Sequence, residues 1–372
     1  MGGTSSIFGG TAPEVPSRRI LTKYGPIEGK RIIHTGDHQV DAFLGIPFAK
    51  PPIGELRFQK PQPPDSWTEV LKTTKFGYRS IQSDFFWDKM MLGVGKDENC
   101  LFLNVFTPVW EPEDPTKGFP VMVFVHGGGY TMDSSVKYGD IGISKYLVRH
   151  GVVVVTIQYR LGALGFLSTG DDVCPGNLGL WDQTFALRWV NENIAAFNGD
   201  NSKVTVFGQS AGGASVDLLS ISPHSRDLFH QVIPMAGNAS CEWALSKKCL
   251  RTKPAAKFEK GLMMGKFDFS DPGIEFGPRI DGDFFPKSIA ELREEAPKKK
   301  CLIGTAEFEG LLFAAFGSAR ITIESFDAVI ASIISEKRYP RNYLELREKV
   351  KRRYLSRAEE HDKTTLTRAF MT

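Results

Sequence analysis

The sequence predicts an α/β protein whose central sheet is mostly parallel, with helices on both faces. Two predicted strands, 120–126 and 151–157, are almost entirely apolar, as strands buried on both faces are. Apolar residues recur at helical spacing between 182 and 195, and a further strand at 204–207 leads into a helical stretch at 211–219. Strands that alternate with helices in this way are typical of a parallel sheet.

The N-terminal third predicts shorter elements. Residues 1–18 are rich in Gly, Ser and Pro and predict a flexible tail, which leaves 19–372 as a single domain. A hairpin is expected from strands 31–34 and 39–44, and a strand at 98–105.

The C-terminal part predicts a mixture of helices and short strands. We expect a strand at 230–234, a helix at 288–295 and a strand at 300–304, followed by a loop. Two long amphipathic stretches, 323–336 and 343–357, predict helices.

Composition excludes several classes of protein. The chain has 372 residues, of which 41% are hydrophobic, and a net charge of +3, which gives no reason to expect nucleic-acid binding. No apolar run approaches the ~20 residues of a membrane-spanning helix, and the N-terminus lacks the apolar core of a signal peptide. The five cysteines are scattered without a CxxC pair, so neither a disulfide framework nor a metal site is expected, and no cofactor is expected.

The first residues, MGGTSS, fit the pattern for N-myristoylation of Gly2. The alternative interpretation is a flexible Gly/Ser tail. A single acyl chain would attach the protein to a membrane only reversibly. We therefore expect a cytoplasmic protein, not a secreted one, with or without reversible membrane attachment; the oligomeric state stays open.

The segment GQSAG, residues 208–212, lies where the strand 204–207 meets the following helix. A G-x-S-x-G sequence in that context predicts a nucleophile elbow, in which Ser210 sits on a strained turn with its hydroxyl exposed. Gly208 and Gly212 lack the side chains that would collide there.

Three glycines, 127–129, follow the predicted strand 120–126. They free backbone amides to face a ligand, so an oxyanion hole is one interpretation and a flexible turn the other. The elbow elsewhere in the chain favours the oxyanion hole.

With these motifs in place, the chain resembles the type-B carboxylesterases, a family of α/β-hydrolases. The segments GIPFAKPP, ENCLFLNV, HGGG, YRLG, PGNLGLWDQ, NIAAFNGD, GQSAGG and IDGDFFP occur in the family's order. The resemblance implies an α/β-hydrolase fold and hydrolysis of a small-molecule ester through an acyl-serine. It implies Ser210 as the nucleophile and the amides of Gly128, Gly129 and Ala211 as the oxyanion hole.

The resemblance also implies an acid and two ion pairs. The family's acid is a Glu in a G-x-x-x-x-E-G loop, and Glu309 takes that place in residues 304–310. From the residues alone Glu307 is an equal rival, and only the register of the motif favours Glu309. The ion pairs implied are two buried structural pairs: Arg57 with Glu98 and Arg160 with Asp182.

The chain departs from the family at three places. Cys100 stands where secreted members form a disulfide with an upstream cysteine, but none precedes it here, which favours the cytoplasm. A helix is expected to be deleted near residues 244–251. The family's triad histidine lies about a hundred residues beyond the acid, farther than this chain extends past Glu309, which predicts a C-terminally incomplete, truncated domain.

The histidines give no clear general base. Only His361 follows Glu309, in the polar run EEHD; the other six precede it, against the family's order: His34, His38, His126, His150, His224 and His230. The resemblance places His126 in the oxyanion loop and not as a base. We therefore expect the triad histidine to be missing and the activity to be low.

Two functions follow, a carboxylic-ester hydrolase or a non-catalytic carboxylesterase-like binding protein or inactive splice product. A cholinesterase is disfavoured, because those relatives carry Glu where this chain has Gln209.

Overall fold

The computed structural model describes most of the chain, in two compact units. Unit 1 comprises residues 1–253 and 274–303, and unit 2 comprises 254–273 and 304–372. The described residues are 15–33, 39–84, 86–171, 173–241, 243–246, 276–307, 309, 327–328, 330–331, 333–336 and 338–355.

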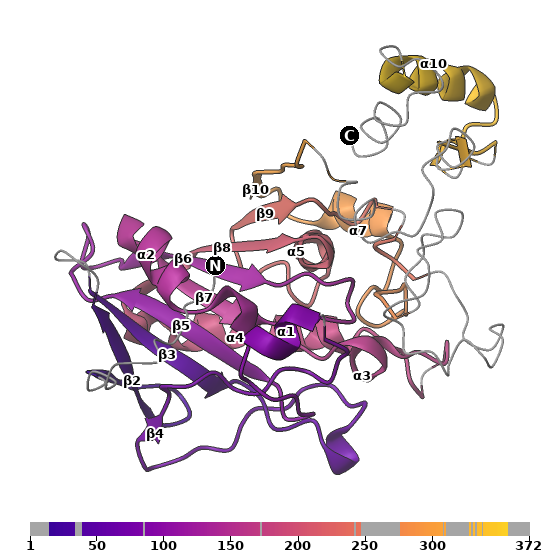
Figure 1. The fold of residues 1–372 in the computed structure, drawn as a ribbon. Coiled ribbons are helices and arrows are strands. Elements are labelled where there is room, and N and C mark those ends of the chain that lie inside the picture. The colour runs from indigo at the N-terminus through magenta and orange to yellow at the C-terminus, as the bar shows by residue number, and fades with distance from the viewer. Residues whose placement is uncertain are drawn as a thin grey trace. The chain divides into compact units, whose positions relative to one another are not determined.

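Unit 1 is built on a ten-stranded sheet with the order β1-β2-β3-β5-β7-β6-β8-β9-β10, in which β4 pairs with β2 (Figure 1). The strands are β1 (Pro16–Leu21), β2 (Pro26–Ile33), β3 (Gln39–Pro47), β4 (Leu71–Lys72), β5 (Phe102–Pro108), β6 (Phe119–Val125), β7 (Val153–Ile157), β8 (Gly199–Gln209), β9 (Gln231–Met235) and β10 (Lys300–Cys301). From β7 to β10 every neighbouring pair is parallel. This half of the sheet agrees with the fold class predicted from the sequence.

The other half of the sheet is antiparallel from β1 to β7. Short connections join β1 to β2 and β2 to β3, and short connections allow only antiparallel pairing. Strand β1 begins at Pro16, inside the segment 1–18 predicted to be a flexible tail. The expected strand at 98–105 begins at Phe102, because residues 98–101 turn before the chain enters the sheet.

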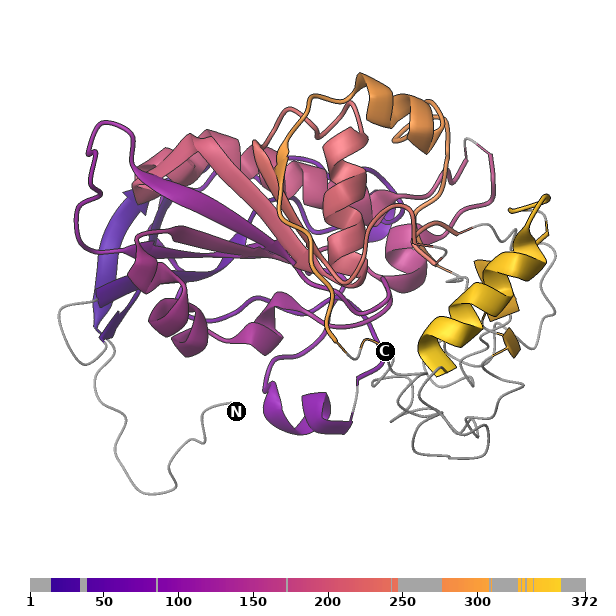
Figure 2. The same cartoon turned by 90° about the horizontal axis from the view of Figure 1, so that it is seen from above.

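Helices in unit 1 cover both faces of the sheet. They are α1 (Phe86–Met91), α2 (Ile141–Tyr146), α3 (Gly162–Phe166), α4 (Leu178–Asn193), α5 (Ala211–Ile221) and α7 (Ile289–Glu295), with short 3-10 turns η1 (Gly54–Leu56), η2 (Ser135–Tyr138), η3 (Val148–His150) and η4 (Ile194–Phe197). Figure 2 shows helices on both sides of the strands.

Alternate residues of β7 pack on opposite faces of the sheet. Val153 and Val155 belong to the large core cluster that includes residues of α4 and α5, whereas Val154 belongs to a smaller cluster with Ile143 of α2. All three valines are at most 1% exposed, which explains why the strand is apolar throughout.

Both ion pairs expected from the resemblance form, but only one is buried. Arg160 and Asp182 lie 2.7 Å apart with side chains 3% and 0% exposed. Arg57 and Glu98 form two hydrogen bonds of 2.6 and 2.7 Å, with side chains 46% and 26% exposed. The expectation that this second pair is buried is wrong, because Arg57 follows an exposed 3-10 turn rather than a core strand.

Unit 2 contains helix α10 (Tyr343–Leu355), in agreement with the amphipathic stretch 343–357. Arg347 of this helix donates to the carbonyls of Ala331 and Ile334, and Lys351 forms an ion pair with Asp327. Over the part of the chain that the structure describes, no helix is both long and apolar enough to cross a membrane.

Candidate functional site

Ser210 lies in the sharp turn between β8 and α5, as the sequence predicts. Its φ of 57° and ψ of −123° place a non-glycine residue in a region that L-residues rarely adopt. Its amide donates to the carbonyl of Met235 at 2.9 Å, and its carbonyl accepts from Ala214 in the first turn of α5. The side chain is half-buried, so the hydroxyl is accessible at the end of the parallel strands.

The two glycines of the GQSAG segment allow helix and strands to approach closely. A Cβ atom on Gly212 would lie 2.1 Å from the carbonyl oxygen of Val125 at the end of β6. A Cβ atom on Gly208 would lie 2.6 Å from the backbone of Gly212. Both positions therefore exclude any side chain, which is the physical reason for the motif.

The glycine run 127–129 lies beside Ser210. A Cβ atom on Gly127 would be 3.2 Å from the Cβ of Ser210 and 2.6 Å from the carbonyl oxygen of Gln209. Gly128 and Gly129 have φ values of +93° and +60°, the left-handed region that favours glycine. The sequence alone left a flexible turn open as an alternative, but this turn is packed against the elbow.

Hydrogen bonds to the backbone carbonyls of the glycine run hold its peptide groups in place. Nδ1 of His126 lies 3.1 Å from the carbonyl oxygen of Gly127, and the carbonyl of Gly128 accepts from the amides of Thr131 and Met132. These peptides are trans, so each amide points away from the preceding carbonyl. The hydrogen bonds to the carbonyls of Gly127 and Gly128 therefore set the directions of the Gly128 and Gly129 amides.

His126 is a buried, neutral imidazole. Burial lowers its pKa, and the residue is 1% exposed. A carbonyl oxygen can only accept, so the proton of the neutral ring is on Nδ1, facing Gly127. This arrangement agrees with the expectation that His126 belongs to the loop; it holds the backbone and is not placed to take a proton.

Sequence reasoning missed Tyr159, which follows β7. Its hydroxyl donates to the carbonyl of His126 at 2.8 Å, and its ring stacks on the imidazole with centroids 4.4 Å apart. In the sequence, the YRLG segment is identifiable only as a motif of the family. A fully buried tyrosine directly after a core strand is a signal that its hydroxyl has a partner.

Glu309 lies in unit 2, and Ser210 lies in unit 1. Within its own unit, the Glu309 carboxylate accepts from the amide of Ala306 at 2.6 Å and is half-buried. Its rival Glu307 is exposed. The pairing of Glu309 with the nucleophile stays a prediction.

Four of the seven histidines are described. His224 lies with Nε2 3.0 Å from the carbonyl of Asp283 and its ring against Trp181, and Nδ1 of His230 accepts from the amide of Val204. His150 is exposed at the end of η3. Among these described histidines, none hydrogen-bonds to Ser210.

Several predicted features lie outside the described residues. These are the lipidation site Gly2, the histidines His34, His38 and His361, and most of the segment 244–251 at which a helix is expected to be deleted.

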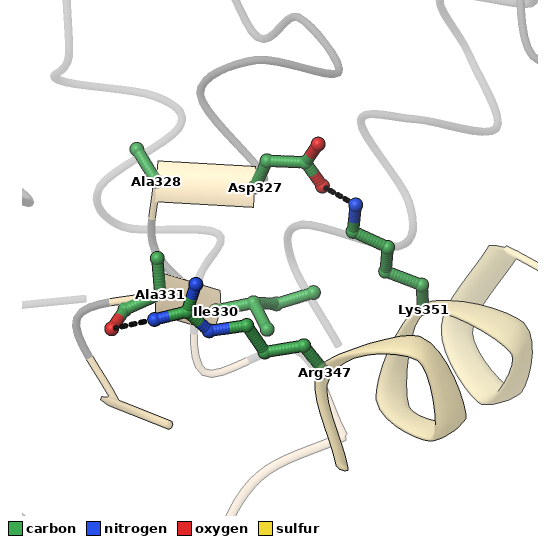
Figure 3. A pocket seen from close by; sticks show the side chains of 6 residues that line it. All are labelled: Asp327, Ala328, Ile330, Ala331, Arg347 and Lys351. Atoms are coloured by element: carbon green, nitrogen blue, oxygen red, sulfur yellow. Dashed lines mark hydrogen bonds and ion pairs between the residues drawn. The ribbon is translucent and has the colours of Figure 1, made fainter. Parts of the chain in front are cut away.

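A separate pocket lies within unit 2 (Figure 3). Its lining residues are Asp327, Ala328, Ile330, Ala331, Arg347 and Lys351. The two cationic side chains are already paired, with an aspartate and with backbone carbonyls, and the lining offers no hydroxyl or thiol nucleophile. Within the described ranges, no group of three or more His, Cys, Asp or Glu side chains could hold a metal ion. The elbow and the glycine run in unit 1 are therefore the candidate site.

Comparisons with known proteins place this site in context. A sequence model described as the carboxylesterase family matches residues 16–248 and 246–372. Esterase cest-33 of Caenorhabditis elegans is 43% identical over 335 residues, which cover 82% of this chain and 60% of that protein. Gut esterase 1 of Caenorhabditis elegans is 35% identical over 369 residues, covering 89% and 63%. The cholinesterase of Mus musculus is 36% identical over 341 residues, covering 80% and 55%. The chain spans less than two thirds of the length of each.

Proposed function

Because the chain belongs to the carboxylesterase family, we propose that it hydrolyses a small-molecule carboxylic ester through an acyl-serine intermediate on Ser210. The observation that carries this proposal is the contact between the strained Ser210 turn and the glycine run at residues 127–129. In that contact the turn that carries the half-buried Ser210 packs against the glycine run, whose amides are the proposed donors. A nucleophile beside preorganised amide donors is the arrangement that acyl transfer requires.

In the proposed reaction the Ser210 hydroxyl oxygen attacks the ester carbonyl carbon, and the carbonyl oxygen becomes an oxyanion. The amides of Gly128, Gly129 and Ala211 donate to it. The C–O bond to the alcohol then breaks, the alcohol leaves with a proton, and water hydrolyses the acyl-serine. Removal of one such donor in serine hydrolases lowers turnover by about 10²–10³.

The proton of Ser210 needs an acceptor, which in the family reaction is an imidazole held by the acid, here Glu309. We expect no histidine of this chain to serve as that base, so activated esters such as p-nitrophenyl acetate will acylate Ser210 slowly, and His361→Ala will not change that rate. Rapid hydrolysis of an unactivated alkyl ester that disappears in His361→Ala would show instead that His361 is the base. Glu309→Gln and Glu307→Gln, compared in the same assay, will separate the two candidate acids.

The decisive experiment is covalent labelling with a fluorophosphonate, followed by mass spectrometry of the labelled peptide. We expect labelling of the wild type on Ser210 and none in Ser210→Ala. Ser202→Ala, which removes an exposed serine of β8, is the matched control and should label normally. An unlabelled but folded wild type would exclude the esterase and favour the alternative of a non-catalytic binding protein.

We also propose that the protein is cytoplasmic and attaches reversibly to membranes through a myristoyl group on Gly2. The support for this is the sequence MGGTSS. Cells fed an alkyne analogue of myristate should label the wild type and not Gly2→Ala. Equal labelling of the two would exclude the site.

A further inference from the structure

The segment that follows β7, residues 159–162, contacts the backbone on both sides of the glycine run. The hydroxyl of Tyr159 donates to the carbonyl of His126 at 2.8 Å, just before the run. The amide of Gly162 donates to the carbonyl of Tyr130 at 2.7 Å, just after it. The three glycines are therefore held between two hydrogen bonds from one neighbouring segment.

This segment is itself anchored in the core. The amide of Arg160 and its guanidinium make three hydrogen bonds to Asp182 of α4, at 3.0, 2.8 and 2.7 Å. Both side chains are buried. The position of Tyr159 is therefore set by the packing of β7 and α4, and not by the glycine loop that it contacts.

Tyr159 contacts His126 through both its ring and its hydroxyl. The two rings stack at an angle of 22°, and both residues are at most 1% exposed. Burial raises the pKa of Tyr159, so its hydroxyl stays protonated and donates. His126 in turn holds the carbonyl of Gly127, which sets the direction of the Gly128 amide.

We infer that Tyr159 is a positioning residue for the oxyanion hole, which holds His126 and thereby directs the amide of Gly128 toward the substrate oxygen. The inference rests on the proposed esterase function. Tyr159 touches no reacting atom. Loss of its hydroxyl keeps the stacked ring but removes the donor from the His126 carbonyl, and the Gly127–Gly128 peptide then gains freedom to rotate.

The test compares Tyr159→Phe with Tyr24→Phe. Tyr24 is also buried, its hydroxyl interacts with Glu192, and it lies in the turn between β1 and β2. The rate of Ser210 phosphonylation is measured over a range of fluorophosphonate concentrations, which separates the maximal rate from the half-saturating concentration. We expect Tyr159→Phe to lower the maximal rate by about tenfold, a part of the effect of losing one donor, with little change in half-saturation. Tyr24→Phe should change neither.

A second measurement does not depend on reactivity. In protein labelled with ¹⁵N-glycine, the amide resonance of Gly128 should shift in Tyr159→Phe and stay in place in Tyr24→Phe. An unchanged maximal rate together with an unchanged Gly128 resonance would overturn the inference. A wild type that does not react, or a Ser210→Ala variant that reacts equally, would instead overturn the proposed function, and the resonance would still decide the role of Tyr159.

Discussion

Hydrogen bonds from neighbouring residues hold Ser210 in its strained backbone conformation. A non-glycine residue in such a region is destabilised by about 1–3 kcal/mol. The hydrogen bonds of its amide to Met235 and of its carbonyl to Ala214 hold the turn from both sides. These contacts fix Ser210 at the end of β8, directly before α5.

This strain can be measured by comparing two substitutions at one position. Ser210→Gly should have a free energy of unfolding about 1 kcal/mol higher than Ser210→Ala, because glycine adopts a positive φ without strain. At Ser215, inside α5, the order should be the opposite. Ser215→Ala should have a free energy of unfolding about 1 kcal/mol higher than Ser215→Gly, because alanine stabilises a helix more than glycine does. Chemical denaturation gives the four values. The same order at both positions would contradict the strain.

The two ion pairs differ in burial, so they should differ in their contribution to stability. Asp182→Asn leaves the buried Arg160 charge uncompensated and should lower the free energy of unfolding by about 3–5 kcal/mol. Glu98→Gln should have little effect, because its partner Arg57 is solvated. Urea denaturation of both variants tests this, and equal losses would show that burial does not distinguish the pairs.

At the scale of elements, the site depends on how closely α5 approaches the end of β6. The Cα of Gly212 faces the carbonyl of Val125, a backbone group within the sheet that cannot move aside. The first turn of α5 and the glycine run both begin where these parallel strands end. The close approach therefore places Ser210 and the loop side by side.

Gly212→Ala should disrupt this contact. The added methyl would lie 2.1 Å from the Val125 oxygen, so we expect a loss of several kcal/mol in stability, or insoluble protein. Gly142→Ala is the control, because that glycine of α2 has open space around its Cα and alanine favours a helix. Thermal unfolding should show a lower melting temperature for the first variant and an equal or higher one for the second. A normal melting temperature for Gly212→Ala would mean that helix and strand are farther apart.

The elements that the sequence predicts well are those with a continuous run of apolar residues. The apolar strand at 120–126 becomes β6, and the strand at 151–157 becomes β7, with shifts of one or two residues. Strand β1 was missed because its residues PSRRIL alternate weakly, and its pairing with β2 stabilises it. Stabilisation by a neighbouring strand leaves no pattern in the residues of the strand itself.

In the candidate site, too, the features with a local sequence pattern could be predicted and those that depend on the fold could not. The sharp turn at Ser210 and the glycine run beside it could be predicted because each requires a residue type at a fixed spacing, whereas their catalytic roles stay predictions. Tyr159 could not, because its role depends on a hydrogen bond to a backbone carbonyl 33 residues away, and any residue's carbonyl would serve. The partner of a buried hydroxyl is visible only in the fold.

At the scale of the whole molecule, groups whose pKa differs between the folded and unfolded states link stability to pH. Burial lowers the pKa of His126, so the folded protein resists protonation at this ring. Glu28 and Asp84 have pKa values lowered from 4.5 and 3.8, so their contribution to the free energy of unfolding is lost only in more acidic solution. Between about pH 5 and 6.5 the histidine dominates among these three.

His126 should therefore make the protein less stable as the pH falls below about 6.5. The unfolded chain binds a proton at this ring near the ordinary histidine pKa, whereas the folded chain does so only at lower pH. Between the two values the unfolded state holds more protons, so the free energy of unfolding falls with decreasing pH, by at most about 1.4 kcal/mol per pH unit. Denaturation at pH 7.0 and 5.5 should show this loss in the wild type and in His150→Asn, where the histidine is exposed. The loss should shrink in His126→Asn, whose amide does not titrate. An undiminished loss in that variant would mean that another group carries the acid sensitivity and that the ring behind the glycine run is not held neutral by burial.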